Sequence, residues 1–256
     1  MSAQIAAAPV RVLPAERPLF WLAMGWRDFL RAPLPSLVHG LIFVIAGAVI
    51  VAIGWGRYEL LAGAFSGFLL VAPMLVAGLY EVSRRLARGE RPTMRDVIRV
   101  WIEGGACMVR MGFLLALLGT LWVGLSTMII VGLGGMKGAG IGDFMRDFVL
   151  SPNWLPFLLW LVAGGIFAAV VFGISVVSVP MLLDRDVNLP TAALTSVRVV
   201  GTNPVPMVLW AALVMMLTLL GIALVLPMLV VVPVLGHATW HAYSDSVDSS
   251  HLAPRF

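Results

Sequence analysis

The sequence predicts an all-α membrane protein: a bundle of six transmembrane helices with amphipathic helices lying in the plane of the cytoplasmic surface. Hydrophobic residues make up 61% of the 256 residues and charged residues 12%, whereas soluble domains carry about 25% charged residues. Several apolar stretches reach the roughly 20 residues that a helix needs to cross a hydrocarbon core about 30 Å thick. Arginine is also concentrated in alternate connecting segments, as expected when alternate connections face the cytoplasm.

Five apolar stretches are the clearest candidate spans: residues 36–55, 60–80, 112–133, 155–180 and 205–235. In lipid the backbone has to satisfy its own hydrogen bonds, so we expect each stretch to be helical. We therefore expect one transmembrane domain over residues 18–247, between a flexible amino-terminal tail (1–17) and a flexible carboxyl-terminal tail (248–256).

The last apolar stretch decides between five spans and six. From Pro204 to Tyr243 there are 40 residues, which would extend about 60 Å as one straight helix. If the chain turns near residues 224–226, Pro227 falls in the first turn of a new helix, where its missing N–H removes no helical hydrogen bond. We therefore expect a sixth span that ends near Tyr243, with five spans as the alternative.

The distribution of basic residues predicts a cytoplasmic amino terminus. With six spans in that orientation, fourteen of the 17 basic residues lie inside, and only Arg57, Lys137 and Arg146 lie outside. Five spans would place thirteen inside and four outside. Both counts follow the positive-inside rule, so charge favours six spans only weakly.

The chain contains a pattern that occurs three times: an amphipathic helix followed by a pair of spans. The second repeat opens at Pro92, where Thr93 and Asp96 have the spacing of a capping box. The third opens at Pro190, and the first begins with an amphipathic segment over residues 20–31.

A proline recurs in the second span of each repeat, at Pro73, Pro180 and Pro233. Proline bends a membrane helix because it frees a backbone carbonyl. Either these prolines shape a shared cavity at the cytoplasmic side, or they reflect the general frequency of proline in membrane helices.

Three histidines are candidate metal ligands. His237 and His241 are four residues apart, so they share one face of a helix and could bind one metal ion. In the six-span topology His39 lies near the same membrane face. A transition-metal or haem site at His39, His237 and His241 is one hypothesis. The alternative is that these histidines hydrogen bond to the backbone or to lipid headgroups, and we expect no resident cofactor.

No nucleophile–base pair, phosphate-binding loop or pair of catalytic carboxylates stands out, so we expect that the protein is not an enzyme. The span interiors contain almost no charged residues, which argues against ion-driven transport. The first hypothesis is a scaffold or accessory factor for other membrane components, for example during assembly of a respiratory complex. The alternatives are a passive transporter or channel for a small or lipid-like solute, and haem or metal binding. Expected partners are membrane lipids and other membrane proteins, and no nucleic acid.

Four segments together resemble a bacterial family of integral inner-membrane proteins of unknown function. They are GWRD ahead of LPSL (25–28 and 34–37), GLYEVSRR (78–85), SVPMLLDR (178–185) and GHATWHAY (236–243). The resemblance covers about residues 18–247 and implies a multi-pass protein of the bacterial inner (cytoplasmic) membrane. Its members often carry the automatic label cytochrome c oxidase subunit I. That oxidase subunit needs more spans, and more histidine ligands than the four histidines here provide, so oxygen reduction is not implied.

Overall fold

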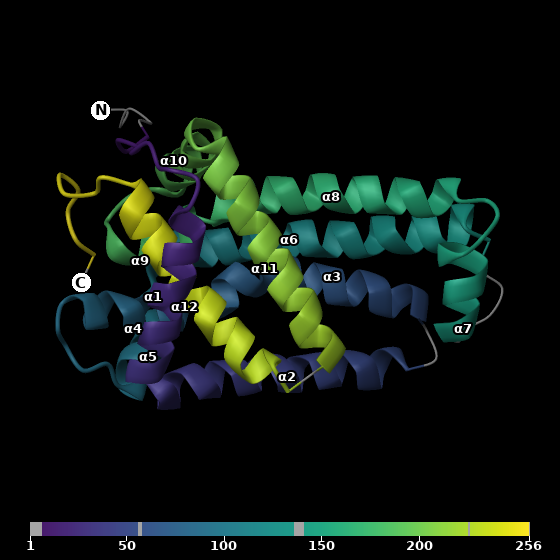
Figure 1. The fold of residues 1–256 in the computed structure, drawn as a ribbon, viewed down its shortest axis with the longest axis horizontal. Coiled ribbons are helices and arrows are strands. Elements are labelled where there is room, and N and C mark those ends of the chain that lie inside the picture. Colours follow the sequence, from purple (N-terminus) through teal and green to yellow (C-terminus); the bar gives the residue numbers. More distant parts are fainter. Residues whose placement is uncertain (1–6, 56–57, 136–140, 225, 256) are drawn as a thin grey trace. The chain divides into compact units, whose positions relative to one another are not determined.

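The computed structural model describes residues 7–55, 58–135, 141–224 and 226–255, and within these residues it is helical, without a strand (Figure 1). The predicted all-α class is therefore confirmed. The helices are α1 (Arg17–Arg31), α2 (Pro33–Gly54), α3 (Tyr58–Leu75), α4 (Ala77–Ala87), α5 (Met94–Glu103), α6 (Gly105–Thr127), η1 (Met128–Leu133), α7 (Ile141–Asp143), η2 (Phe144–Val149), α8 (Leu155–Ser175), α9 (Ser178–Asp184), α10 (Leu189–Thr202), α11 (Pro204–Leu224) and α12 (Met228–Ser246).

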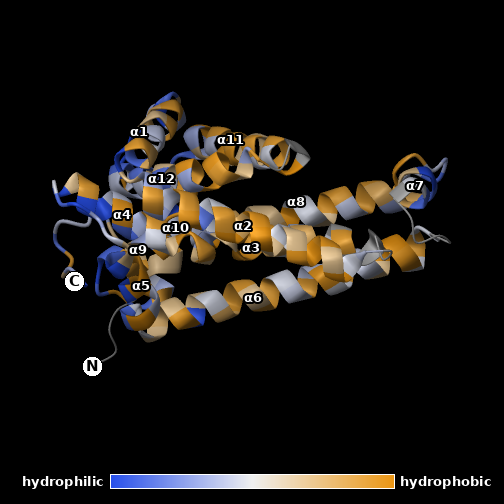
Figure 2. Ribbon diagram, turned by 90° about the horizontal axis from the view of Figure 1, so that it is seen from below, coloured by the Kyte–Doolittle hydropathy of each residue, from blue (hydrophilic) through white to orange (hydrophobic). Residues whose placement is uncertain are grey.

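Five helical segments of the described residues are long and apolar enough to cross a membrane. They are Pro33–Gly54, Gly63–Ala87, Gly105–Leu133, Leu155–Asp184 and Pro204–Ile222, which correspond to the five apolar stretches of the sequence. Figure 2 shows α2, α6, α8 and α11 mostly in the colour of hydrophobic residues, with hydrophilic residues gathered on α1, α4 and α5. Many leucine, isoleucine and valine side chains on the long helices are exposed, as expected for surfaces in contact with lipid.

The last apolar stretch breaks where the sequence predicted. Helix α11 ends at Leu224, and α12 begins at Met228, directly after Pro227. However, α12 is not among the five segments that qualify as spans. Its second half carries polar side chains such as His237 and Thr239 and is largely buried by other helices. The sixth helix therefore forms as expected. Length and composition nevertheless support five membrane spans, which was the alternative to the expected six.

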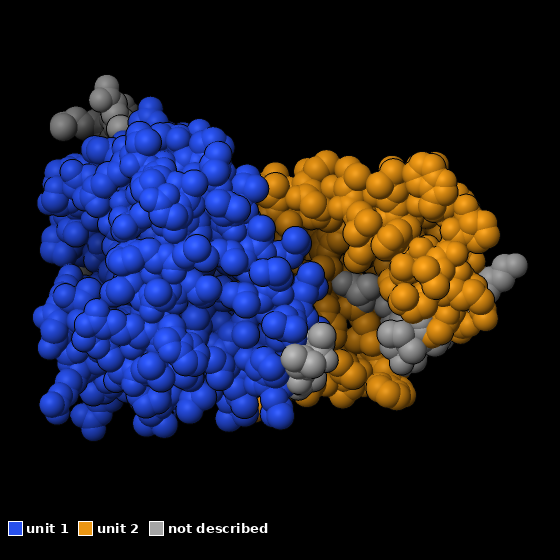
Figure 3. All heavy atoms as spheres, in the orientation of Figure 1, with its two compact units in different colours: residues 1–44, 73–111, 172–256 blue, residues 45–72, 112–171 orange. Residues whose placement is uncertain are grey.

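The chain divides into two compact units (Figure 3): unit 1 comprises residues 1–44, 73–111 and 172–256, and unit 2 comprises residues 45–72 and 112–171. Unit 2 has an apolar core in which Phe148 contacts the rings of Phe157 and Trp160. In the same unit α3 and α6 approach closely, because a Cβ added at Gly67 would lie 3.2 Å from the carbonyl oxygen of Gly119. Small residues commonly allow such close contact between membrane helices.

Unit 1 has a threefold arrangement of one amphipathic helix and one terminal helix in each repeat, whereas the predicted pair of spans is not supported in the third repeat, where only α11 qualifies as a span among the described residues. The amphipathic helices are α1, α5 and α10, and the helices that end each repeat, called exit helices here, are α4, α9 and α12. Helix α5 packs on α4, α10 packs on α9, and α1 packs on α12. The exit helices also contact one another. Because the first amphipathic helix packs on the last exit helix, the three repeats close into a ring.

Helix α5 begins where its sequence indicates, whereas α1 begins at Arg17, ahead of the expected residue 20. The predicted capping box of α5 is present: the backbone N–H of Thr93 donates to Oδ2 of Asp96 at 2.8 Å. Helix α10 is capped by Asn188, whose Oδ1 accepts from the N–H of Thr191 at 2.8 Å. These caps satisfy backbone groups that have no partner inside the helix.

The three repeated prolines differ in their local structure. Pro73 lies inside α3, which ends two residues later, before α4 begins. Pro180 lies in the first turn of α9, after the chain has already broken at residues 176–177. Pro233 lies inside the continuous helix α12. The breaks between α3 and α4 and between α8 and α9 therefore have no counterpart in the third repeat.

Candidate functional site

Close approach of α1 to α12 positions the buried polar groups of unit 1. A Cβ added at Gly25 would lie 2.5 Å from the carbonyl oxygen of Val234 and 2.7 Å from the backbone nitrogen of Ala238. Only glycine fits at this crossing, because the atoms it meets belong to the backbone of α12. Asp28, almost one turn after Gly25, is thereby brought next to the histidines of α12.

His237 lies at the centre of this cluster and is fully buried. Its Nε2 is 2.9 Å from the hydroxyl of Ser36 in α2, and its Nδ1 is 2.8 Å from the hydroxyl of Ser83 in α4. Both serines are also fully buried. One side chain of α12 therefore joins the beginning of α2 to α4.

Asp28 extends the cluster to His241. Its Oδ2 accepts a hydrogen bond from the Ser83 hydroxyl at 2.7 Å and lies 2.8 Å from Nε2 of His241. Only 3% of Asp28 is exposed, so this carboxyl depends on protein partners for its solvation. We call Asp28, Ser36, Ser83, His237 and His241 the polar cluster.

The polar cluster places a constraint on its protons. The hydroxyl of Ser36 donates to the carbonyl oxygen of Ala32 at 2.6 Å, so towards His237 it can only accept, from an Nε2–H group. The single hydroxyl proton of Ser83 can be given to Asp28 or to Nδ1 of His237, but not to both.

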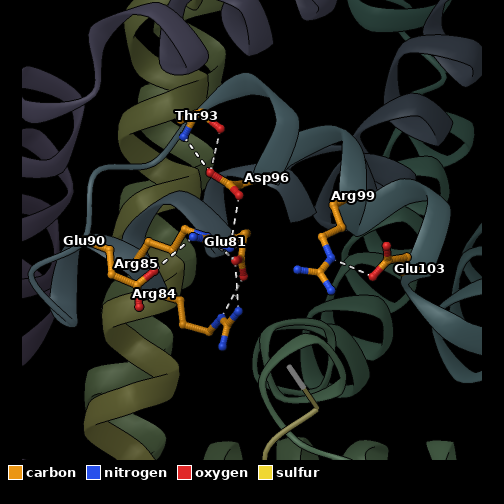
Figure 4. A network of polar contacts seen from close by, with 8 residues as sticks. All are labelled: Glu81, Arg84, Arg85, Glu90, Thr93, Asp96, Arg99 and Glu103. Atoms are coloured by element: carbon orange, nitrogen blue, oxygen red, sulfur yellow. Dashed lines mark hydrogen bonds and ion pairs between the residues drawn. The ribbon is translucent and has the colours of Figure 1, made fainter.

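A second polar network joins α4 to α5 (Figure 4). Glu81 is buried and accepts from Nε and Nη2 of Arg84, at 2.7 and 2.9 Å, and from Nε of Arg85 at 2.8 Å. Arg85 also pairs with Glu90 at 2.9 Å and with Asp96 at 3.0 Å. Since Asp96 caps α5, the same carboxyl that starts this helix also ties it to α4.

The environment of Asp96 keeps its carboxyl ionised. Partial burial would raise its pKa, but hydrogen bonds from Thr93 and the positive charge of Arg85 outweigh burial and hold the pKa below its usual range. Asp96 therefore remains a negatively charged partner for Arg85 at neutral pH.

The three predicted metal ligands lie in unit 1, and each is hydrogen bonded within the protein. His237 contacts Ser36 and Ser83, and His241 contacts Asp28. Nδ1 of His39 lies 2.8 Å from the carbonyl oxygen of Pro35, the backbone bonding that the alternative hypothesis expected. No group of three or more His, Cys, Asp or Glu side chains in the described part of the chain is arranged to hold a metal ion. Metal or haem binding stays a prediction.

Sequence reasoning did not single out Asp28 and Ser83 as members of this site. Both nevertheless lie in the segments that carry the family resemblance, GWRD and GLYEVSRR. Asp28 and Ser83 could therefore have been identified as isolated polar residues inside the segments that resemble the family.

Unit 1 also contains a cavity of about 330 Å³ that is lined by all three exit helices. Arg84 of α4, Tyr243 of α12 and Asp184, the last residue of α9, are among its lining residues. The Tyr243 hydroxyl donates to Oδ2 of Asp184 at 2.9 Å, so the wall of the cavity is itself hydrogen bonded. No member of the polar cluster lines this cavity.

Residues 60–184 match the model of a family described as "Predicted integral membrane protein (DUF2189)". This match confirms the resemblance to an integral membrane family of unknown function, and it covers the chain from α3 to the end of α9. No curated protein and no solved structure matches this chain.

Proposed function

We propose that this integral membrane protein is a non-enzymatic accessory factor, a scaffold that binds other membrane proteins in the bacterial inner membrane with its amino terminus in the cytoplasm. The observation that supports this function is the closed polar cluster. Ser36, Ser83 and His237 are fully buried, and each hydrogen bonds to another side chain. Catalysis or solute passage would need such groups to face accessible space. Here these groups join helices of the chain to one another. The rigidity that results suits a protein that binds other membrane proteins.

The arginine-rich loops and chain ends support the proposed orientation, because basic residues collect on the cytoplasmic side of a membrane protein. A respiratory complex under assembly is the class of partner that we propose. Assembly intermediates expose apolar surface within the bilayer, and the long helices of this chain also expose apolar surface, for example Leu117, Leu121 and Leu219.

Extraction of native membranes in a mild detergent tests the scaffold function. We expect this chain to co-migrate with a second membrane protein in a fixed ratio, and membranes that lack the chain to contain less assembled respiratory complex. Restoring the chain should restore that amount. Recovery of the chain only by itself, together with an unchanged amount of assembled complex, would contradict the scaffold function.

Passive transport is the second candidate, and the cavity among the exit helices favours it. A carrier for a small or lipid-like solute would use a cavity of this kind as its site on one side of the membrane. Purified chain in lipid vesicles would then accelerate solute efflux over protein-free vesicles. Under the scaffold function we expect equal efflux from both preparations.

A further inference from the structure

The acidic and basic side chains of unit 1 are unequally paired. Except for Glu16, each described Asp or Glu of unit 1 lies within ion-pair distance of an arginine or a histidine. By contrast, four exposed arginines on the amphipathic helices have no ion-pair partner among the residues that the structure describes. They are Arg27 and Arg31 on α1, Arg95 on α5 and Arg198 on α10.

Three of these unpaired arginines, Arg27, Arg95 and Arg198, stand beside exposed apolar side chains of the same helix. On α1, Leu30 is 59% exposed and lies three residues after Arg27. On α5, Ile98 and Ile102 are 51% and 78% exposed and follow Arg95 by three and seven residues. Side chains three residues apart are neighbours on a helix surface, and side chains seven apart lie on the same face.

Helix α10 has the same combination, because Leu194 is 43% exposed and lies four residues before Arg198. The combination of an unpaired arginine and exposed apolar side chains therefore occurs on the amphipathic helix of each of the three repeats. A helix with cations next to exposed apolar groups is suited to the boundary between lipid headgroups and acyl chains. Long arginine side chains can reach the headgroups while their stems lie against apolar surface.

We propose that α1, α5 and α10 bind the headgroups of anionic phospholipids through Arg27, Arg31, Arg95 and Arg198. The guanidinium group matches the oxygen atoms of a phosphodiester in shape and charge. Zwitterionic lipids offer the same phosphate but carry a compensating cation, so the unpaired arginines select lipids with net negative charge. This lipid selectivity does not rest on the accessory function proposed above.

The test compares lipid binding to the full chain purified in detergent. Phosphatidylglycerol and phosphatidylcholine with identical acyl chains compete for the protein, and bound lipid is counted by native mass spectrometry. We expect the protein to prefer phosphatidylglycerol. The triple variant Arg27→Gln/Arg95→Gln/Arg198→Gln should lower this preference by about fivefold for each arginine lost. The three single variants should each lower it by about fivefold, which keeps the test valid if the triple variant does not fold.

The matched control lies on the same helix as Arg95. Arg99 pairs with Glu103 at 2.6 Å, so the double variant Arg99→Gln/Glu103→Gln removes an arginine without changing net charge and should keep the preference for phosphatidylglycerol. An equal loss in this control, or no loss in the single variants, would overturn the proposal. Displacement of the lipid by the same concentration of inorganic phosphate would also overturn it, because it would indicate a site for a free anion.

Discussion

Replacement of Glu81 by alanine is expected to destabilise the protein by about 3–5 kcal/mol, because it removes one partner of a buried ion pair. Glu81 and Arg84 are each only 3% exposed. The change would leave the guanidinium of Arg84 inside the protein without the carboxylate that binds two of its nitrogens, and it would remove one of the acidic partners of Arg85. Thermal unfolding of the purified chain in detergent, followed by tryptophan fluorescence, measures the effect.

The control for Glu81 is an exposed ion pair. In the pair of Arg99 and Glu103 the side chains are 53% and 48% exposed, so Glu103→Ala should change stability by about 1 kcal/mol or less. The double variant Glu81→Ala/Arg84→Ala should be less damaging than Glu81→Ala alone, since no buried charge is left without its partner. If Glu81→Ala and Glu103→Ala unfolded at the same temperature, the buried pair would not have the stabilising effect assigned to it.

Replacement of Asp28 by alanine is the second large change, and we expect it to release α1 from α12. The variant would remove the acceptor of the Ser83 hydroxyl and the partner of His241. A buried polar group that loses its partner costs about 1–3 kcal/mol, and two groups are affected here. Hydrogen exchange should therefore become faster at the amides of α1, with a smaller change in α8, which lies mostly in unit 2.

Two further variants test whether the Asp28 effect comes from the buried carboxyl. Asp28→Asn keeps the shape and one acceptor oxygen, so its effect should be intermediate. Arg27→Ala changes the neighbouring residue, which is exposed, and should alter stability by about 0.5 kcal/mol or less. If the amides of α1 exchanged hydrogen equally fast in Asp28→Ala and Arg27→Ala, the carboxyl of Asp28 would not be what holds the helix in place.

Much of the helical organisation could be read from the sequence because it depends on local chemistry. Pro227 predicted the break between α11 and α12, since proline is favoured in the first turn of a helix, where its missing N–H removes no helical hydrogen bond. Thr93 and Asp96 predicted the start of α5 by their spacing. The membrane crossing of the sixth helix was not supported, because the second half of α12 is too polar for this helix to qualify as a span.

The polar cluster could be predicted only in part. The spacing of His237 and His241 placed both on one face of a helix. In the structure His241 contacts Asp28 directly, and His237 contacts Ser83, which also hydrogen bonds to Asp28. Their partners were not predictable from spacing. Asp28 and His237 are more than 200 residues apart, and the sequence alone does not indicate that the first helix of the chain packs on the last.

The sequence by itself determined that this is a helical, multi-span membrane protein with an amphipathic helix recurring three times, because composition, apolar length and helix caps act within a few turns of chain. Only the tertiary structure decided which polar groups meet. The repeats close into a ring when α1 packs on α12, and Gly25 allows the two backbones to approach closely enough for Asp28 to reach the cluster. Contacts of this kind depend on how distant helices pack, and packing is a property of the whole fold.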